Sequence, residues 1–272
     1  MKIPRPKLNV VELTLLGVLV AALGYFGGHF RAVARLAPFL THSARELQPF
    51  QDRYGRARNS EHGEEWIIRD FFQDQRGGVF VDVGANDPQR FSNTFYLETA
   101  LGWSGLAVEP QTKFAEGYRT LRPRTTLVPL FVSDVSNREA VLYVPRNNDL
   151  IASSSKAFVE TEGGTDTQPV HTNTTTLDDL LERSGISRID FLSIDIELHE
   201  PAALAGFSID RYRPRLVAIE GHLEVRQQIL DYFAAHGYVV LGKYLRADAE
   251  NIWFAPRSSE GAEALIVVEG RS

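Results

Sequence analysis

The chain has 272 residues, of which 43% are hydrophobic, and this is enough to form one α/β domain with a full core. Its 29 Lys and Arg residues against 35 Asp and Glu leave a formal net charge of -6. This argues against a nucleic-acid partner, because no strong positive field is available to neutralise phosphates. The chain contains no cysteine, which excludes disulfides, thiolate metal sites and a cysteine nucleophile.

The first predicted element is a largely apolar segment over residues 8–28, with Asn9 and Glu12 as its polar members. A helix of this length reaches across a hydrocarbon core of about 30 Å. Basic residues flank it in similar number on both sides, so charge does not predict its orientation. We interpret residues 1–30 as a single-pass membrane anchor, followed by a juxtamembrane linker over residues 31–60. A cleavable signal peptide is the alternative.

A helix near residues 64–73 is predicted to lead into a short apolar strand over residues 79–83, of the kind that is buried in a parallel sheet. The strand stops at Gly84, where glycine permits a sharp turn and a close approach of the backbone to a ligand. A second strand over residues 106–108 ends in Glu109, whose carboxylate can accept a hydrogen bond from each hydroxyl of a ribose. Together these features predict a nucleoside-binding βαβ unit.

The turn after the first strand distinguishes two classes of ligand. It reads GANDP over residues 84–88, with one glycine, whereas dinucleotide sites usually carry G-x-G-x-x-G around the pyrophosphate. The aspartate in this turn would repel a pyrophosphate, whereas Asp82 and Asp87 complement the ammonium and sulfonium of S-adenosylmethionine. The charges therefore favour the methyl donor. An ordinary turn capped by Asp87 is the alternative.

Strand and helix signals then alternate, as in a doubly wound, mostly parallel α/β sheet. A helix is predicted over residues 114–121 and a third strand over residues 127–132. This strand ends in Ser133 and Asp134, a pair that could reach the adenine of the donor. A plain turn at these two residues is an equal alternative.

A polar segment over residues 147–166 lies between predicted strands at residues 138–145 and 168–174. Long irregular insertions on an α/β scaffold commonly cover the active site. We therefore interpret this segment as a substrate lid, with a mobile surface loop as the alternative.

A second cluster of ionisable residues follows a helix at residues 177–184 and a strongly apolar strand at residues 189–194. It consists of Asp195, Glu197, His199 and Glu200. Such a cluster is costly inside a fold unless its members face a ligand, a metal or one another. The next strand, residues 216–219, ends in Glu220 and His222. Since parallel strands open onto one crevice at their carboxyl ends, Asp195 is expected beside the cofactor.

These residues could serve in two ways. Asp195, Glu197 and Glu220, together with His222, could bind a divalent cation, or one group could take the proton from an acceptor hydroxyl. As the base, His222 is preferred over His199, and His199 over Asp195. For His199 and Glu200 the alternative is a structural role at the start of the next helix, where negative charge is favourable.

Five motifs over residues 61–256 resemble the FkbM-type S-adenosylmethionine-dependent methyltransferases. They are FVDVGAND, GWSGLAVEP, TTLDDLL, IDFLSIDIELHE and ENIWFAP, in this order. The resemblance implies a Rossmann-like class I methyltransferase domain over residues 61–257, with a seven-stranded sheet whose last strand is antiparallel and a C-terminal tail over residues 258–272. It also implies O-methylation of hydroxyls on sugars, polyketides or related molecules.

The same resemblance implies roles for particular residues. Asp82, Gly84, Asn86 and Glu109 would contact the methyl donor, and Asp195 with Glu197 would lie at the reaction centre. This chain departs from the usual family pattern at two positions, because Pro88 and Leu198 stand where glycine is usual. Proline fixes φ, and leucine adds bulk in a tight turn.

The expected reaction is a direct in-line transfer of the methyl group to an acceptor oxygen. An anchored enzyme meets membrane-tethered acceptors at high effective concentration, so a glycolipid or lipid-linked glycan is the expected acceptor. The catalytic domain is expected on the cytoplasmic face, since the methyl donor is made in the cytosol. The alternatives are a membrane-anchored, catalytically inactive binding protein and a nucleotide-dependent oxidoreductase.

Overall fold

The computed structural model describes residues 46–257. The predicted anchor, much of the predicted linker and the C-terminal tail lie outside the described residues. Within residues 46–257, no helix combines the length and the hydropathy that crossing a membrane requires. The compact unit begins at Leu47, inside the predicted linker, because residues 47–54 are helical and Phe50 is buried in the core of the domain.

The main sheet has seven strands in the spatial order β3-β2-β1-β7-β8-β10-β9. In chain order they are β1 (Val79–Val83), β2 (Ser104–Val108), β3 (Thr125–Val128), β7 (Phe191–Ile194), β8 (Leu216–Glu220), β9 (Tyr238–Val240) and β10 (Asn251–Pro256). β10 runs antiparallel to both neighbours, and the other pairs along the sheet are parallel. The predicted seven-stranded α/β arrangement with an antiparallel last strand is confirmed.

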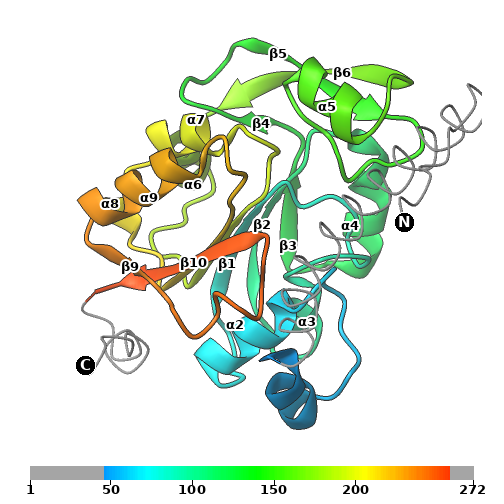
Figure 1. Ribbon diagram of the computed structural model, residues 1–272. Coiled ribbons are helices and arrows are strands. Elements are labelled where there is room, and N and C mark those ends of the chain that lie inside the picture. The colour runs from blue at the N-terminus through cyan, green and yellow to red at the C-terminus, as the bar shows by residue number, and fades with distance from the viewer. Residues whose placement is uncertain (1–45, 258–272) are drawn as a thin grey trace, which may run out of the picture. The chain divides into compact units, whose positions relative to one another are not determined.

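Helices cover both faces of this sheet, as Figure 1 shows. Their bounds are α2 (Glu64–Phe72), α3 (Phe95–Thr99), η1 (Thr112–Phe114), α4 (Ala115–Leu121), α5 (Lys156–Glu162), α6 (Leu177–Arg183), α7 (Glu200–Ala205), α8 (Ile209–Tyr212) and α9 (Arg226–Ala235). The helices predicted over residues 64–73, 114–121 and 177–184 are therefore present.

Alternating side chains of the strands form two cores. On one face, Phe80 and Phe191 pack with Trp66 of α2 and with Trp253 of β10. On the other face, the intervening apolar residues of the same strands pack against α6, α7 and α9. Because both faces are covered, the central strands are apolar in almost every position, and this is why their sequence is readable as buried parallel strands.

The third predicted strand, residues 127–132, is wrong as a single element. β3 ends at Val128, and a separate two-residue strand, β4 (Phe131–Val132), pairs with β6 (Thr167–Thr175) of a second sheet. Pro129 stands between the two and has no N–H for a ladder hydrogen bond, so pairing stops there. β5 (Glu139–Pro145) completes the small sheet, which has the order β4-β6-β5.

Candidate active site

A cavity of about 290 Å³ lies at the carboxyl ends of the central strands. Val83 of β1 pairs with Val108 of β2 and with Ile194 of β7, so Gly84, Glu109 and Asp195 follow at the same level of the sheet. All three line the cavity. The sequence argument that these strand ends meet is therefore confirmed.

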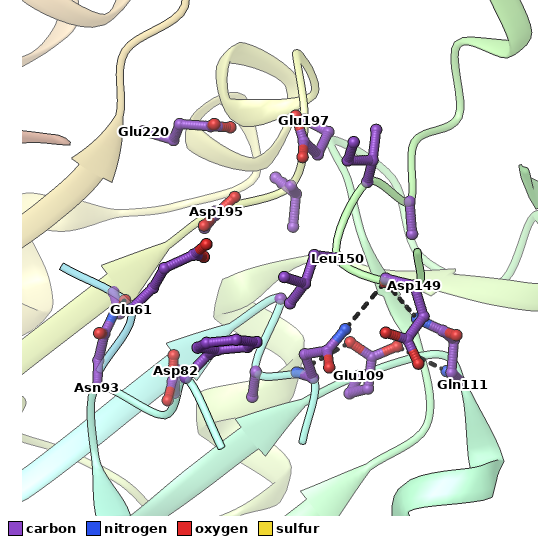
Figure 2. A pocket seen from close by; sticks show the side chains of 18 of the residues that line it. Glu61, Asp82, Asn93, Glu109, Gln111, Asp149, Leu150, Asp195, Glu197 and Glu220 are labelled. Carbon is purple, nitrogen blue, oxygen red and sulfur yellow. Dashed lines mark hydrogen bonds between the residues drawn. The ribbon is translucent and has the colours of Figure 1, made fainter. Parts of the chain in front are cut away.

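The cavity is strongly acidic. Its described lining includes nine Asp and Glu residues and no Lys, Arg or His; the nine are Glu61, Glu64, Asp82, Glu109, Asp149, Asp195, Glu197, Glu220 and Glu250. Figure 2 shows Asp195, Glu197 and Glu220 on one side of this space and Glu109 on the other. A ligand that carries positive charge is favoured in such a site, and an anionic ligand is disfavoured.

Gly84 makes the sharp turn after β1 with φ of +83°. A Cβ atom at this position would lie 1.8 Å from the carbonyl oxygen of Asp195. Glycine is therefore required by the close approach of two strand ends. This contact is with the backbone at the end of β7, and the predicted close approach to a ligand stays a prediction.

Glu109 is 4% exposed, and its carboxylate holds the loops that follow β1 and β2. Its two carboxylate oxygens accept hydrogen bonds from the backbone N–H groups of Asn86, at 3.1 Å, and Gln111, at 2.8 Å. Burial raises its pKa, and these hydrogen bonds act in the opposite direction. Each oxygen retains one lone pair, so the carboxylate can still accept two hydroxyl hydrogen bonds.

The segment predicted as a lid contributes residues 148–152 to the cavity wall. The backbone carbonyl of Asp149 accepts hydrogen bonds from Asn86 Nδ2, at 3.0 Å, and from Gln111 Nε2, at 3.4 Å (Figure 2). The side chain of Asp149 also pairs with Lys113. These contacts tie the segment to the loops that surround Glu109.

Asp82 is fixed by a buried polar network behind the cavity. Its carboxylate accepts a hydrogen bond from Thr94 Oγ1 at 2.8 Å, and Thr94 in turn accepts one from Arg122 at 3.0 Å. Arg122 and Glu98 form an ion pair at 2.6 Å in which both side chains are almost fully buried. Burial raises the pKa of Asp82, while Thr94 and Arg122 act against the rise.

Three of the residues predicted to bind the donor are not among the described lining of this cavity. Asp87 accepts hydrogen bonds from the backbone N–H groups of Gln89 and Arg90, so it caps a turn, which is the alternative that the sequence left open. Ser133 and Asp134 bond to each other beside His199. They are displaced because β4, which precedes them, belongs to the small sheet.

His199 also lies outside the described cavity lining. Its ring contacts the hydroxyls of Ser133, at 3.1 Å, and Ser154, at 3.3 Å, and lies 4.6 Å from the ring of Phe131. Burial lowers its pKa. These contacts support the structural role at the start of α7, where His199 is the N-cap residue, over a role as the base.

The second carboxylate cluster is built by β7 and β8. Ile194 pairs with Ile219, which brings Asp195 beside Glu220. Nε2 of His222 lies 2.9 Å from the Glu220 carboxylate and 3.1 Å from that of Glu197. The hydrogen bond to Glu220 is the main cause that raises the pKa of His222, to about 9, so the ring is protonated at neutral pH. His222 is then poorly suited as the base in the free protein.

Burial and the same crowding raise the pKa values of the carboxyl groups in this cluster. Burial, followed by the neighbouring charges of Glu220 and Glu197, raises the pKa of Asp195 well above its usual range. Burial and Glu220 raise the pKa of Glu197 to about 8. Asp195 is nevertheless exposed to the cavity, so a ligand bound there can reach its carboxyl group.

The turn between β7 and α7 is held by several contacts. Glu197 and Leu198 have φ of +53° and +76°, a region that favours glycine. Ser153 Oγ donates to the carbonyl of Glu197 at 2.6 Å, and the N–H of Ile196 donates to Glu200 at 3.1 Å. Leu198 packs against the core and is not part of the described cavity lining. The turn that the resemblance predicts with glycine is therefore formed here with leucine.

The candidate cation site differs from the predicted one. Glu197, Glu220 and His222 each offer a ligand atom, and these atoms lie within 4.8 Å of one another. Oε2 of Glu220 is buried and has no hydrogen-bond partner in the described structure. Asp195, which the sequence included as a ligand, is not part of this group.

Several residues of the cavity wall were not predicted. Glu61 comes from the segment before α2 and Glu64 is the first residue of α2. Phe91 and Asn93 come from the loop after β1, and Gln111 from the loop after β2. Gln111 follows Glu109 by two residues, and its position just after the end of β2 is the one feature of the sequence that could have indicated its place in the cavity wall. The others reach the site through loop paths that no local pattern encodes.

Comparison with known proteins places the chain in a family. The family described as Methyltransferase FkbM domain matches residues 82–240, which is more than half of the chain. No relative was found among curated proteins.

Three similar solved structures are methyltransferases. One is the methyltransferase FkbM from Methylobacillus flagellatus KT, with 12% identity, a TM-score of 0.40 and coverage of 83% of this chain and 60% of that one. Another is a TehB-like SAM-dependent methyltransferase from Corynebacterium glutamicum ATCC 13032 Kitasato, with 14% identity, a TM-score of 0.41 and coverage of 79% and 98%. The third is the precorrin-6y C5,15-methyltransferase from Geobacter metallireducens GS-15, with 14% identity, a TM-score of 0.37 and coverage of 65% and 71%.

The chain thus spans about 60% of the length of the FkbM structure. The family match covers β1 from Asp82, the strand ends with Glu109 and Asp195, and the chain as far as β9. The protein belongs to the FkbM methyltransferase family.

Proposed function

We propose that this protein transfers a methyl group from S-adenosylmethionine to a hydroxyl group of its acceptor. The acidity of the cavity carries the proposal, since nine Asp and Glu residues line it and its described lining has no Lys, Arg or His. The donor brings an ammonium and a sulfonium, both of which such a lining attracts. The pyrophosphate of a dinucleotide would be repelled, which disfavours the oxidoreductase alternative.

The residues around Glu109 fit the ribose of the donor. Glu109 lies at the end of β2, faces the cavity and keeps lone pairs for two hydroxyl groups after its bonds to Asn86 and Gln111. Gly84 lets the loop after β1 pass directly over the end of β7. The donor's methyl group would then be directed toward Asp195 and Glu220.

Asp195 is the proposed base for the acceptor hydroxyl. It is exposed to the cavity and lies beside Glu220 at the strand ends where the acceptor hydroxyl would be placed, although its pKa is raised in the free protein. Binding of a positively charged sulfonium nearby favours the ionised carboxylate, so the donor itself would prepare the base. This order reverses the sequence-based preference, in which His222 came first.

A divalent cation held by Glu197, Glu220 and His222 is a further part of the proposal. The three ligand atoms lie within 4.8 Å of one another, and Oε2 of Glu220 is buried without a hydrogen-bond partner in the described structure. When bound, such an ion would act as a Lewis acid toward the acceptor oxygen. Titration of Mn²⁺, followed by its electron paramagnetic resonance signal, tests this, and Glu220→Gln should abolish the binding.

We also propose that the acceptor is a sugar hydroxyl on a glycolipid or lipid-linked glycan, and that the domain lies on the cytoplasmic side of the membrane. The apolar segment at residues 8–28 supports the membrane part of this proposal. Protease treatment of intact cells tests it, because a cytoplasmic domain would be protected until the membrane is opened. Cleavage from outside would overturn the placement.

Calorimetric titration of the full chain tests the donor. S-adenosylmethionine should bind in the micromolar range, NADH should not bind, and Glu109→Ala should lose the donor. Asp134→Asn is the matched control, because Asp134 is exposed and is not among the described lining residues. If S-adenosylmethionine fails to bind the wild type, the inactive binding protein becomes the better interpretation.

A further inference from the structure

An open hollow of about 510 Å³ lies on the surface beside the acidic cavity. Two segments form its wall, residues 56–61 before α2 and residues 89–91 of the loop after β1. Ser60 and Phe91 form a β-bridge that joins the two segments. Glu61 and Phe91 line both the hollow and the cavity, so the two spaces adjoin.

The charge of this hollow is opposite to that of the cavity. Arg56, Arg58 and Arg90 line it, and all three are exposed. Among the described residues, none of the three forms an ion pair with a carboxylate. The one acidic residue of the described lining is Glu61, and Figure 2 shows its side chain directed toward Asp195 in the cavity. We call this positive surface the arginine hollow.

Contacts with aromatic rings position two of the arginines and leave donors available. The Arg58 guanidinium lies 4.9 Å from the centroid of the Trp66 ring and donates one hydrogen bond, at 2.8 Å, to the carbonyl of Glu61. The Arg90 guanidinium lies 4.5 Å from the centroid of the Phe91 ring. Because a guanidinium has five N–H donors in a fixed plane, each group can still bind phosphate oxygens.

The positive surface ends at Arg90. This residue also lines a neighbouring hollow, whose other charged residues are Asp87 and Lys113. Lys113 already pairs with the side chain of Asp149, so this neighbouring hollow adds no positive charge. The arginine hollow is therefore a local positive area on a chain with a formal net charge of -6.

The length of chain before the domain indicates what meets this surface. The proposed anchor is the apolar segment at residues 8–28, and the described chain begins at residue 46. Residues 29–45 lie between them, and a chain of this length spans at most about 60 Å when fully extended. A bilayer that holds the anchor is then present at high effective concentration beside the domain. The cytoplasmic leaflet carries anionic lipids, which attract arginine side chains near the membrane surface.

We propose that the arginine hollow docks the domain on the phosphate groups of an anionic phospholipid bilayer. The inference rests on the membrane part of the proposed function and adds to it the face of the domain that meets the lipid. Since Glu61 and Phe91 line both spaces, docking brings this side of the acidic cavity to the membrane surface.

The absence of cysteine from the chain allows one fluorescent label to be placed at a chosen position. Ala57→Cys puts the label in the arginine hollow. Ser187→Cys puts the same label on the exposed loop before β7, at the opposite end of the strands, as a control. Each labelled full chain is reconstituted into vesicles of phosphatidylcholine, either alone or with about one third phosphatidylserine, and nitroxide headgroups quench labels that approach the lipid.

Quenching at position 57 should be at least about threefold stronger in the anionic vesicles than in the neutral ones, because both hold the anchor but only one attracts the arginines. Quenching at position 187 should stay low in both. About 1 M salt should remove the difference at position 57, since the Debye length then falls to about 3 Å.

Charge variants locate the docking surface. Replacing all three arginines by glutamine should reduce the quenching at position 57 to its value in neutral vesicles, since each arginine near an anionic surface strengthens binding about fivefold. The variant is Arg56→Gln, Arg58→Gln and Arg90→Gln. Lysine at the same three positions keeps the charge and should retain the quenching, which separates loss of charge from loss of the arginine contacts. The matched control replaces exposed arginines outside the hollow and should behave like the wild type; it is Arg76→Gln, Arg124→Gln and Arg183→Gln.

The outcomes separate the inference from the proposed function. If the full chain does not float with the vesicles, the membrane part of the proposed function fails, and the same labels with anionic vesicles added still report on the arginine hollow. If quenching at position 57 is equal with and without phosphatidylserine, equals that at position 187 or persists in the glutamine variant, the inference is overturned. Suppression by inorganic phosphate at constant ionic strength would show a site for free phosphate and would also overturn it.

Discussion

Glu200 provides a test of how burial shapes the electrostatics near the site. Its side chain is fully buried at the start of α7, one oxygen accepts from the N–H of Ile196, and the other has no hydrogen-bond partner in the described structure. Burial raises its pKa from 4.5 to about 7. Below the pKa that Glu200 has in the unfolded chain, the carboxyl group is neutral in both the folded and the unfolded state. Its ionisation then does not affect the free energy of unfolding.

Stability is lost as the pH rises toward the folded pKa, because the unfolded chain ionises first. The loss is about 1.4 kcal/mol per pH unit between the two pKa values. Between about pH 5 and about pH 8 this one group should remove about 2.5 kcal/mol from the free energy of unfolding. Glu200→Gln keeps the acceptor for Ile196 but cannot ionise, so this part of the pH dependence should disappear.

Urea unfolding of both proteins at the two pH values measures the effect. Any constant cost of burying the new amide cancels in the comparison between pH values. Glu224→Gln makes the same chemical change at an exposed position and should behave like the wild type. If the wild type and Glu200→Gln lose equal stability between the two pH values, the reasoning from burial is refuted.

Three further substitutions test the β1 turn, the buried ion pair and the turn before α7. Gly84→Ala should lower the free energy of unfolding by about 2 kcal/mol or more, because φ is +83° and the new Cβ would meet the Asp195 carbonyl; an unchanged urea midpoint would contradict this. Arg122→Ala should cost about 3–5 kcal/mol, measured in the same way, since it leaves the Glu98 carboxylate buried without its partner. Leu198→Gly should leave the calorimetric affinity for S-adenosylmethionine unchanged, because Leu198 packs against the core outside the described cavity lining. A large change in that affinity would show that the departure from glycine affects the donor site.

The strand ends that form the site were predictable from the sequence. The runs that become β1, β2, β7 and β8 are apolar because both faces of the sheet are covered, and residues that follow such strands meet at one edge. Glu109 and Asp195 were found in this way. Asp87 could be assigned to either of two roles, and only its hydrogen bonds to the turn decide between them.

The remaining features depend on packing between distant segments. Ser133 and Asp134 were misplaced because the chain leaves the main sheet after Pro129, and the choice between two sheets is made by long-range pairing. The protonation state of His222 was not predictable, because its pKa depends on the carboxylates of Glu197 and Glu220. The contact between these groups follows from the packing of the β7 and β8 ends, which sequence periodicity does not encode.

The most direct test of the central claim is a crystal structure with S-adenosylhomocysteine, which keeps the ribose of the donor. Both ribose hydroxyls should lie within about 3.2 Å of the Glu109 carboxylate oxygens, with the sulfur directed toward Asp195. A ligand bound elsewhere, or bound in the cavity with its ribose away from Glu109, would contradict it.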